Sequence, residues 1–346
     1  MNDNSTTANL LSFLRGGSGA RGTRSLTTGI AALVLTGALL AVLQATVSGY
    51  VMTLVAFALL HVMLAVSLQL TNGLTGLFSL GHPGFMTVGG YMAALLTFPA
   101  SRKEFMLPGL PDILRTAEWG LLPASLAGGV AAALVAVVIG FPVLRLRGHY
   151  LAVATLGFII IVRVLFNNAE EWTRGALGLN GLPYLTNIWW VFGFTALTIF
   201  VAWRIKHASL GRAMMSVREN EMAAACSGID PARVKMLAFV IGAFFAGIVG
   251  ALWTHLVTTI TPGSFSIMLA FMLVVMVVIG GTGSITGAIV AALVIVGLDE
   301  GLKVIQTSLG VYGLSQIVIA LGVLLVLIFR PRGLFGSAEP RIFGGR

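Results

Sequence analysis

The chain has 346 residues, of which 57% are hydrophobic and 10% are charged, and its mean hydropathy is +0.97. Soluble domains carry about 25% charged residues, so this composition excludes an ordinary soluble protein. The net charge of +9 does not indicate nucleic acid, because basic residues of membrane proteins gather in their cytoplasmic loops. We therefore predict an all-α polytopic integral membrane protein, embedded in a lipid bilayer and without a nucleic-acid partner.

Apolar segments predict about ten transmembrane helices, within a range of eight to ten. The expected segments are 28–48, 50–70, 84–98, 119–141, 150–166, 188–205, 234–257, 266–281, 284–300 and 314–329. Because a helix needs about 20 residues to cross the hydrocarbon, the short segments 84–98, 150–166 and 266–281 are expected to be tilted, broken or re-entrant. This predicts a flexible cytoplasmic tail (1–27), a transmembrane domain (28–330) and a cytoplasmic C-terminal tail (331–346).

Basic residues are distributed unevenly between the loops. With ten crossings and the N-terminus inside, fifteen Lys and Arg residues lie on the cytoplasmic side and five on the outer side, and Arg163 lies within a helix. Shifting the count by one crossing scatters the basic loops over both sides. The positive-inside rule therefore favours ten helices with both termini cytoplasmic.

The stretch GLFSLGHPGFMTVGGYM at 76–92 interrupts the apolar pattern. Irregular backbone at membrane depth is tolerated only where protein covers it or where it lines a polar cavity. Ser79, Gly81, His82 and Pro83 are therefore candidates for a translocation path. The alternative is a structural kink, in which His82 satisfies a neighbouring helix end.

The segment GSITGAIVAAL at 283–293 has a similar Gly/Ser-rich break leading into a helix of small residues. Paired interrupted helices indicate a transport site, although small-residue helix packing explains the pattern equally well.

Arg163 is a third feature of interest, because a charge within a membrane helix is costly and normally faces protein or water. It is expected to extend towards the interface, to pair with Asp299 or Glu300, or to meet a solute carboxylate. We count it among the candidates for the translocation path.

The loop 206–233 is the most charged part of the chain. Its helix formers predict one helix over about 210–227, with Gly228 as its C-cap and Asp230 with Pro231 opening the next helix. Such a helix is either a plain connector or an element that docks a separate protein. No phosphate-binding loop is present in the sequence, so a transporter of this kind needs an energy-converting partner.

The sequence RENEMAAACSGI at 218–229 resembles the coupling segment of ATP-binding-cassette (ABC) importer permeases, whose E-x-A-A-x-x-x-G pattern meets the ATPase. Glu221, Ala223, Ala224 and Gly228 match that pattern. The segments NGLTGLFSLGHPGFMTVGGYMAALLT (72–97), RLRGHYLAVATLGFIIIVRVLFNN (145–168) and VIGGTGSITGAIVAAL (278–293) are similar to further signatures of branched-chain amino acid permeases, in the same order. The R-L-R-G-x-Y motif at 145–150 is typical of the M-type subunit.

This resemblance implies a permease subunit of an importer in the bacterial inner membrane. It implies two ABC ATPase subunits, a second, paired permease subunit and a periplasmic or surface solute-binding protein as partners. The chain itself is then no enzyme and holds no cofactor, because the ATPase subunits bind ATP and magnesium. In this scheme Arg218, Glu219 and Glu221 dock the ATPase, and Gly228 sets the helix end.

Branched-chain amino acids are the expected solutes, and urea, short amides and aromatic acids remain alternatives. They remain because the chain has apolar residues, Ile159 and Ile160, where the family is expected to have an acidic one. A stand-alone ion-coupled carrier is the alternative of another class, and it needs a buried acidic residue for coupling. Among acidic residues, the predicted membrane segments contain only Asp299 and Glu300, near an edge. His61 and His255 are expected to be packed residues rather than metal ligands.

Overall fold

The computed structural model describes residues 34–310 except 147, together with 313–330 and 333–336. A helix lies in each of the ten predicted apolar segments, and the all-α fold class is confirmed. The helices are Val34–Thr46, α3 (Gly49–Leu68), α4 (His82–Thr97), α7 (Leu121–Val143), α8 (His149–Asn168), α10 (Ile188–His207), α13 (Pro231–Val257), α14 (Ile267–Gly280), α15 (Ile285–Leu309) and α16 (Leu314–Phe329). The predicted tails 1–27 and 331–346 lie outside the described residues, apart from 333–336.

Five helices of the described chain are long and apolar enough to cross a membrane. They are α3 with its continuation to Leu74, α7, α8, α10 and α13. Helix Val34–Thr46, α14 and α16 are apolar but shorter. The expected shortness of segment 266–281 is thus confirmed, whereas segment 150–166 extends to a full-length helix in α8.

The remaining elements are short. They are η1 (Gln69–Leu74), α5 (Ala100–Met106), α6 (Asp112–Arg115), α9 (Glu170–Thr173), η2 (Gly175–Leu177), α11 (Ser209–Glu219), α12 (Glu221–Cys226), β1 (Leu179–Asn180) and β2 (Thr259–Ile260). Strands β1 and β2 pair antiparallel, with Leu179 opposite Ile260.

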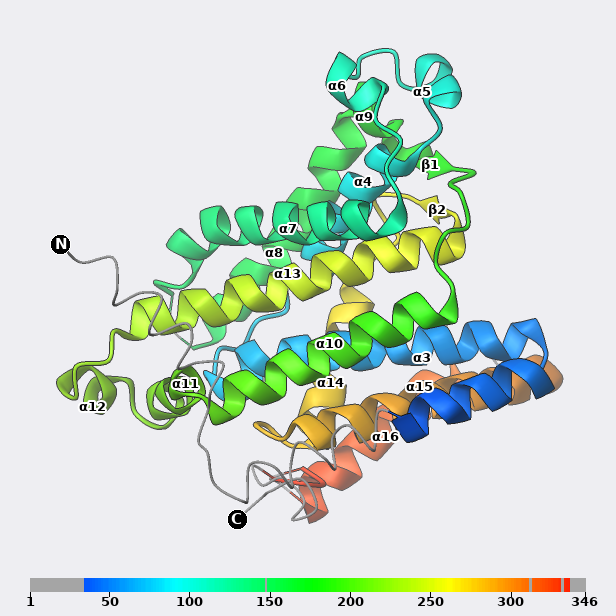
Figure 1. Cartoon of the computed structure of the whole chain (residues 1–346). Helices are drawn as coiled ribbons and strands as arrows, with labels where there is room; N and C mark the ends of the chain where they lie inside the picture. The colour runs from blue at the N-terminus through cyan, green and yellow to red at the C-terminus, as the bar shows by residue number, and fades with distance from the viewer. Residues whose placement is uncertain (1–33, 147, 311–312, 331–332, 337–346) are drawn as a thin grey trace.

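Helices α11 and α12 lie at one end of the bundle, which we call the coupling end, and β1, β2 and the start of α3 lie at the opposite end (Figure 1). At that opposite end the indole N–H of Trp189, in the first turn of α10, donates to the side chain of Gln44 at 3.0 Å. At the coupling end the backbone N–H of Leu334 donates to the carbonyl of Ile279, in the last turn of α14, at 2.8 Å. The last described residues therefore return to the coupling end.

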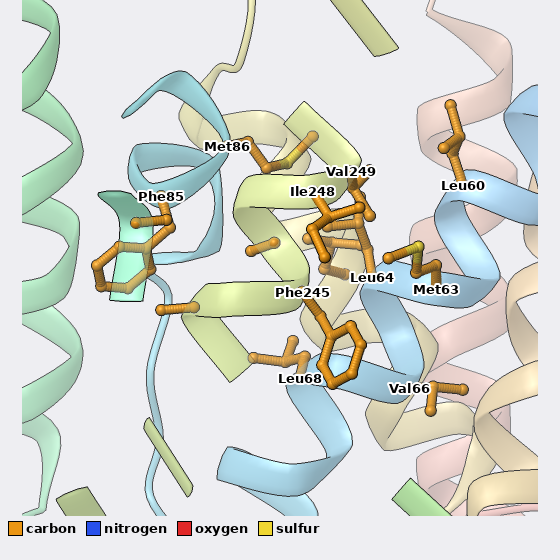
Figure 2. Close-up of a cluster of buried hydrophobic side chains, with 14 of the residues drawn as sticks. Leu60, Met63, Leu64, Val66, Leu68, Phe85, Met86, Phe245, Ile248 and Val249 are labelled. Carbon is orange, nitrogen blue, oxygen red and sulfur yellow. The ribbon is translucent and has the colours of Figure 1, made fainter. Parts of the chain in front are cut away.

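The core forms where α13 packs between α4, α7 and α3. Figure 2 shows Leu64 and Met63 of α3 beside Phe245 of α13, and each of these three side chains is at most 3% exposed. Since lipid tails are as apolar as these side chains, close packing rather than the hydrophobic effect holds the helices together.

Glycines set the spacing between α4, α7 and α13. A Cβ atom on Gly89 would lie 2.3 Å from the carbonyl oxygen of Gly247, and one on Gly128 would lie 2.5 Å from the carbonyl oxygen of Gly89. Three helix backbones thus meet around Gly89, at a distance that no larger residue permits. This contact fixes α4, whose first residue is His82, against the most buried long helix.

The connection between α4 and α7 is ordered around Lys103 of α5. Its side chain is buried, and its Nζ atom donates to the carbonyl oxygens of Leu114, at 2.8 Å, and Ala117. Burial lowers the pKa of the Lys103 ammonium, and the carboxylate of Glu118 partly opposes this shift. This buried side chain therefore ties α5 to the end of α6, beside the buried apolar residues Leu107 and Leu110.

Candidate translocation and coupling site

The first helix break lies between α3 and α4. Helix α3 continues into the wider π turns of η1, the chain leaves the helix after Leu74, and α4 begins at His82 with Pro83 in its first turn. Proline has no amide hydrogen to leave unpaired there, which makes it suited to a helix start.

Side chains satisfy the backbone of this break. The Asn72 side chain accepts from the Ser79 N–H and donates to the Ser79 carbonyl, both at 3.1 Å. The Leu80 N–H donates to the Thr155 hydroxyl of α8 at 3.0 Å, and the Gly81 N–H donates to the Ser79 hydroxyl at 3.3 Å. The irregular backbone of this break is therefore hydrogen-bonded to protein, as it must be at membrane depth.

All four predicted path residues of this break (Ser79, Gly81, His82 and Pro83) are buried within the single chain. His82 is 2% exposed, and neither ring nitrogen has a hydrogen-bond partner among the described residues. Its ring lies beside α13, because a Cβ atom on Gly242 would be 3.6 Å from His82 Cε1. A buried polar group left unpaired costs about 1–3 kcal/mol, so this imidazole is available to a water or a solute.

Arg163 lies on the exposed side of α8, among the exposed apolar residues Ile160 and Val164. It has no hydrogen bond or ion pair with any described residue. The pairing with Asp299 or Glu300, one of the expected alternatives, does not occur, because both carboxylates bind Lys303 at 2.9 and 2.7 Å. The structure does not bring Arg163 and His82 into contact.

The coupling segment is two helices instead of the single expected helix over 210–227. The chain is extended at Asn220, with φ −158° and ψ 108°, and the Asn220 side chain caps α12 by accepting from the Ala223 N–H at 3.0 Å. The sequence did not predict this break, because good helix formers lie on both sides of Asn220. An asparagine followed at once by Glu221 is nevertheless an N-terminal signal that the sequence contains.

The predicted end of the segment is confirmed. Gly228 has φ +83°, its N–H donates to the Ala225 carbonyl at 3.0 Å, and the Ile229 N–H donates to the Ala224 carbonyl at 3.1 Å. This pair of bonds is the Schellman motif, which needs a left-handed residue where Gly228 stands. Asp230 then caps α13 by accepting from the backbone N–H groups of Ala232 and Arg233, as expected.

The predicted coupling residues point in different directions. The Glu219 side chain is 79% exposed, and Glu221 is partly exposed and pairs with Lys235 of α13 at 2.6 Å. Ala223 lies at the surface and Ala224 is buried. Arg218 turns inward, and its Nη1 atom donates to the carbonyl of Gly73 at 2.7 Å and to that of Thr282 at 3.2 Å.

A cavity of about 470 Å³ opens at the coupling end between three of the sequence motifs. Its walls come from the loop after η1, from the turn into α8 and from the junction of α11 with α12. The lining residues are Thr75, Gly76, Leu77, Phe78, Leu146, Gly148, His149, Leu151, Val217, Arg218, Glu219, Asn220, Glu221 and Lys235.

The two lone histidines of the apolar runs are buried and hydrogen-bonded. His61 Nδ1 lies 2.8 Å from the Phe57 carbonyl, and the ring packs on Trp253. His255 Nδ1 lies 2.7 Å from the Ala251 carbonyl and Nε2 lies 2.6 Å from the Thr97 hydroxyl. In the described part of the chain, no cluster of three or more His, Cys, Asp or Glu side chains is arranged to hold a metal ion.

The fold and this site define a polytopic helical membrane protein of the transport class, with broken helices joined to a capped segment between membrane helices. Residues 49–329 match the family described as the permease component of branched-chain amino acid transport systems. The chain belongs to this family, which confirms the resemblance seen in the sequence and favours a transporter subunit over a stand-alone carrier.

The curated relatives agree. The chain is 31% identical to the high-affinity branched-chain amino acid transport system permease protein LivM of Escherichia coli K12, over 82% of this chain and 69% of the relative. It is 26% identical to LivH of the same organism, over 81% of this chain and 92% of the relative. It is also 24% identical to the ribose import permease protein RbsC of Haemophilus influenzae, over 64% of this chain and 70% of the relative. No solved structure matches the chain.

Proposed function

We propose that this chain is the membrane-spanning subunit of an ABC importer for branched-chain amino acids. The observation that carries the proposal is the coupling segment, which exposes Glu219 and Glu221 while Arg218 holds its inner face to both helix breaks. A docked partner that moved this segment would therefore act on the interior of the bundle. The names of the LivM and LivH relatives support the choice of solute.

The proposed assembly contains two ABC ATPase subunits, a second, paired permease and a periplasmic or surface solute-binding protein. The ATPase subunits bind ATP and magnesium, so this chain supplies no catalytic group and needs no cofactor. The coupling segment meets the ATPase through the exposed Glu219, Glu221 and Ala223, while Arg218 and Ala224 face the permease and Gly228 ends α12. The surplus of basic residues in the loops of the coupling end supports a bacterial inner membrane location with both termini cytoplasmic.

The proposed translocation path runs beside the first helix break and α8. His82, with Ser79, Gly81 and Pro83, offers a polar surface in the interior. The unpaired charge of Arg163 suits the carboxylate of an amino acid. Alternating access then follows from a shift between two arrangements of these helices, driven by the ATPases. The replacement of an expected acid by Ile159 and Ile160 keeps urea, short amides and aromatic acids as alternative solutes.

The test is reconstitution. The chain is co-expressed with the ATPase and permease subunits encoded beside it, purified, and placed in liposomes with the candidate binding protein. We expect ATP hydrolysis to rise when the binding protein carries leucine, isoleucine or valine, and to rise less with urea, acetamide or phenylalanine. If only urea or an aromatic acid stimulated ATP hydrolysis, that compound would be the solute instead of a branched-chain amino acid. A chain that purifies alone and transports solute along an ion gradient would overturn the proposal.

Cys226 gives an independent measurement on the native chain, because it is the only cysteine and is exposed on α12. We expect the ATPase subunits to protect it from a membrane-impermeant maleimide, and Cys226→Ser to abolish the labelling. Equal labelling with and without the ATPases would show that docking occurs elsewhere.

A further inference from the structure

The turn between α14 and α15 is held by side chains from other elements. Its four consecutive carbonyl oxygens, at residues 281–284, all accept hydrogen bonds. Gln69 Nε2 donates to the carbonyls of Gly281 and Ser284 at 2.9 and 3.1 Å, and Lys206 Nζ donates to that of Gly283 at 2.6 Å. Arg218 Nη1 donates to that of Thr282. We call this set the carbonyl hub.

Two of the three donors are cations, and one of them binds at a helix C-terminus. Helix α14 ends at Gly280, immediately before the hub, and η1 ends at Leu74, beside the Gly73 carbonyl that Arg218 also binds. The C-terminus of a helix carries a partial negative charge, so Arg218 stabilises the end of η1 by its charge as well as by hydrogen bonding, whereas Lys206 binds the Gly283 carbonyl within the turn itself. Lys206 is 8% exposed, which strengthens these electrostatic interactions.

Two of the hub donors, Lys206 and Arg218, come from α10 and α11, which meet at the start of the coupling segment. Lys206 is in the last turn of α10, and α11 folds back onto that turn so tightly that a Cβ atom on Gly211 would lie 2.2 Å from the Ile205 carbonyl oxygen. Helix α11 and the end of α10 therefore behave as one corner. Hydrogen bonds of 2.6–3.2 Å do not survive a displacement of an ångström, so a moving corner must pull the hub or release it.

On these contacts, and resting on the proposed function, we infer that Gln69 and Lys206 are positioning residues for coupling. They transmit movement of the α10–α11 corner to both helix breaks: Gln69 itself belongs to η1, whose far end leads into the first break, and the hub is the second break. The two Gly-rich breaks lie far apart in the sequence, but these hydrogen bonds make them shift together when the corner moves.

The test uses the complete importer in liposomes and compares Lys206→Met and Gln69→Met, which keep length and volume but remove the donors. We expect the complexes to assemble with basal ATP hydrolysis within about twofold of wild type. Stimulation by liganded binding protein should be largely lost, and transport should fall at least tenfold. Lys206→Arg, which keeps a cationic donor, should restore most of the stimulation.

Lys303→Met is the matched control, because Lys303 is an exposed lysine of α15, outside the coupling segment, and its Nζ atom binds the carboxylates of Asp299 and Glu300 instead of the hub. It should behave as wild type. Wild-type stimulation and transport in both donor variants would overturn the inference, and so would a parallel loss of assembly and basal hydrolysis. If Lys206→Met does not reach the membrane, Lys206→Gln is measured by the same criteria. If liganded binding protein did not stimulate ATP hydrolysis even in the wild-type complex, the proposed function itself would be refuted, and not this inference alone.

Discussion

Substituting Gly89 by alanine tests the packing that positions the first helix break. The added methyl would lie 2.3 Å from the Gly247 carbonyl oxygen, whereas ordinary contact begins at 3.4 Å. Helices α4 and α13 would therefore have to separate by about 1.1 Å, and Gly128 of α7, on the other side of Gly89, restricts that movement. Overpacking of this kind costs about 1–3 kcal/mol, and because the opposing atoms belong to the backbone we expect the upper part of the range.

The assay is thermal unfolding of the purified permease in detergent, followed by the loss of the monodisperse peak in size-exclusion chromatography after heating. Gly89→Ala should lower the midpoint by roughly 3–4 °C, since unfolding a chain of this length releases about 0.7 kcal/mol/K of entropy. Gly193→Ala in α10 is the control, because no heavy atom lies within 4 Å of its Cβ position. It should leave the midpoint unchanged or raise it slightly, since alanine is the better helix former. An unchanged midpoint for Gly89→Ala would refute the argument that this glycine contact holds the helices.

Three further predictions concern the coupling segment and the short lobe between α4 and α7. Asn220→Ala removes the N-cap of α12 and should cost about 1 kcal/mol locally, seen as roughly fivefold faster hydrogen exchange of the α12 amides with α11 unchanged. Glu221→Arg should abolish ATPase assembly or coupling, measured by co-purification, whereas Glu221→Gln should have the smaller effect. For Lys103 the pKa is lower in the folded lobe, so the unfolded lobe binds more protons and stability rises with pH below about 10.4. Proteolysis of residues 99–118 should therefore slow from pH 7.5 to pH 9.5, and this change should shrink in Lys103→Met.

The positions of the membrane helices could be predicted because apolar length and basic loops follow from the bilayer itself. Segment 188–205 was expected and α10 spans Ile188–His207, while α13 begins earlier than 234 because Asp230 caps it. The start of α13 and the end of α12 were also predictable, since caps depend on neighbouring residues alone. Local chemistry and the lipid solvent together determine these features.

The interior of the site could not be predicted, because it depends on contacts between distant segments. Arg218 follows a run of helix formers and precedes an acidic residue, which is equally consistent with docking a partner and with facing inward. Only the placement of Gly73 and Thr282 beside it shows that its guanidinium binds the permease itself. Gln69 gave no signal at all, since a single amide in an apolar run has no pattern.

Among the described membrane helices, most charged side chains have a partner within the chain, but one does not. The surface that carries this unpaired charge is the one that needs an external partner. Lys303 pairs with Asp299 and Glu300, and the two hub cations bind backbone carbonyls. Arg163 instead projects from an apolar helix without a partner among the described residues. A charge at that depth is costly against lipid, so the α8 face that carries it must meet protein, solute or water. Because α8 also supplies the Thr155 hydroxyl that holds the first helix break, this one helix connects that break with the surface that needs a partner.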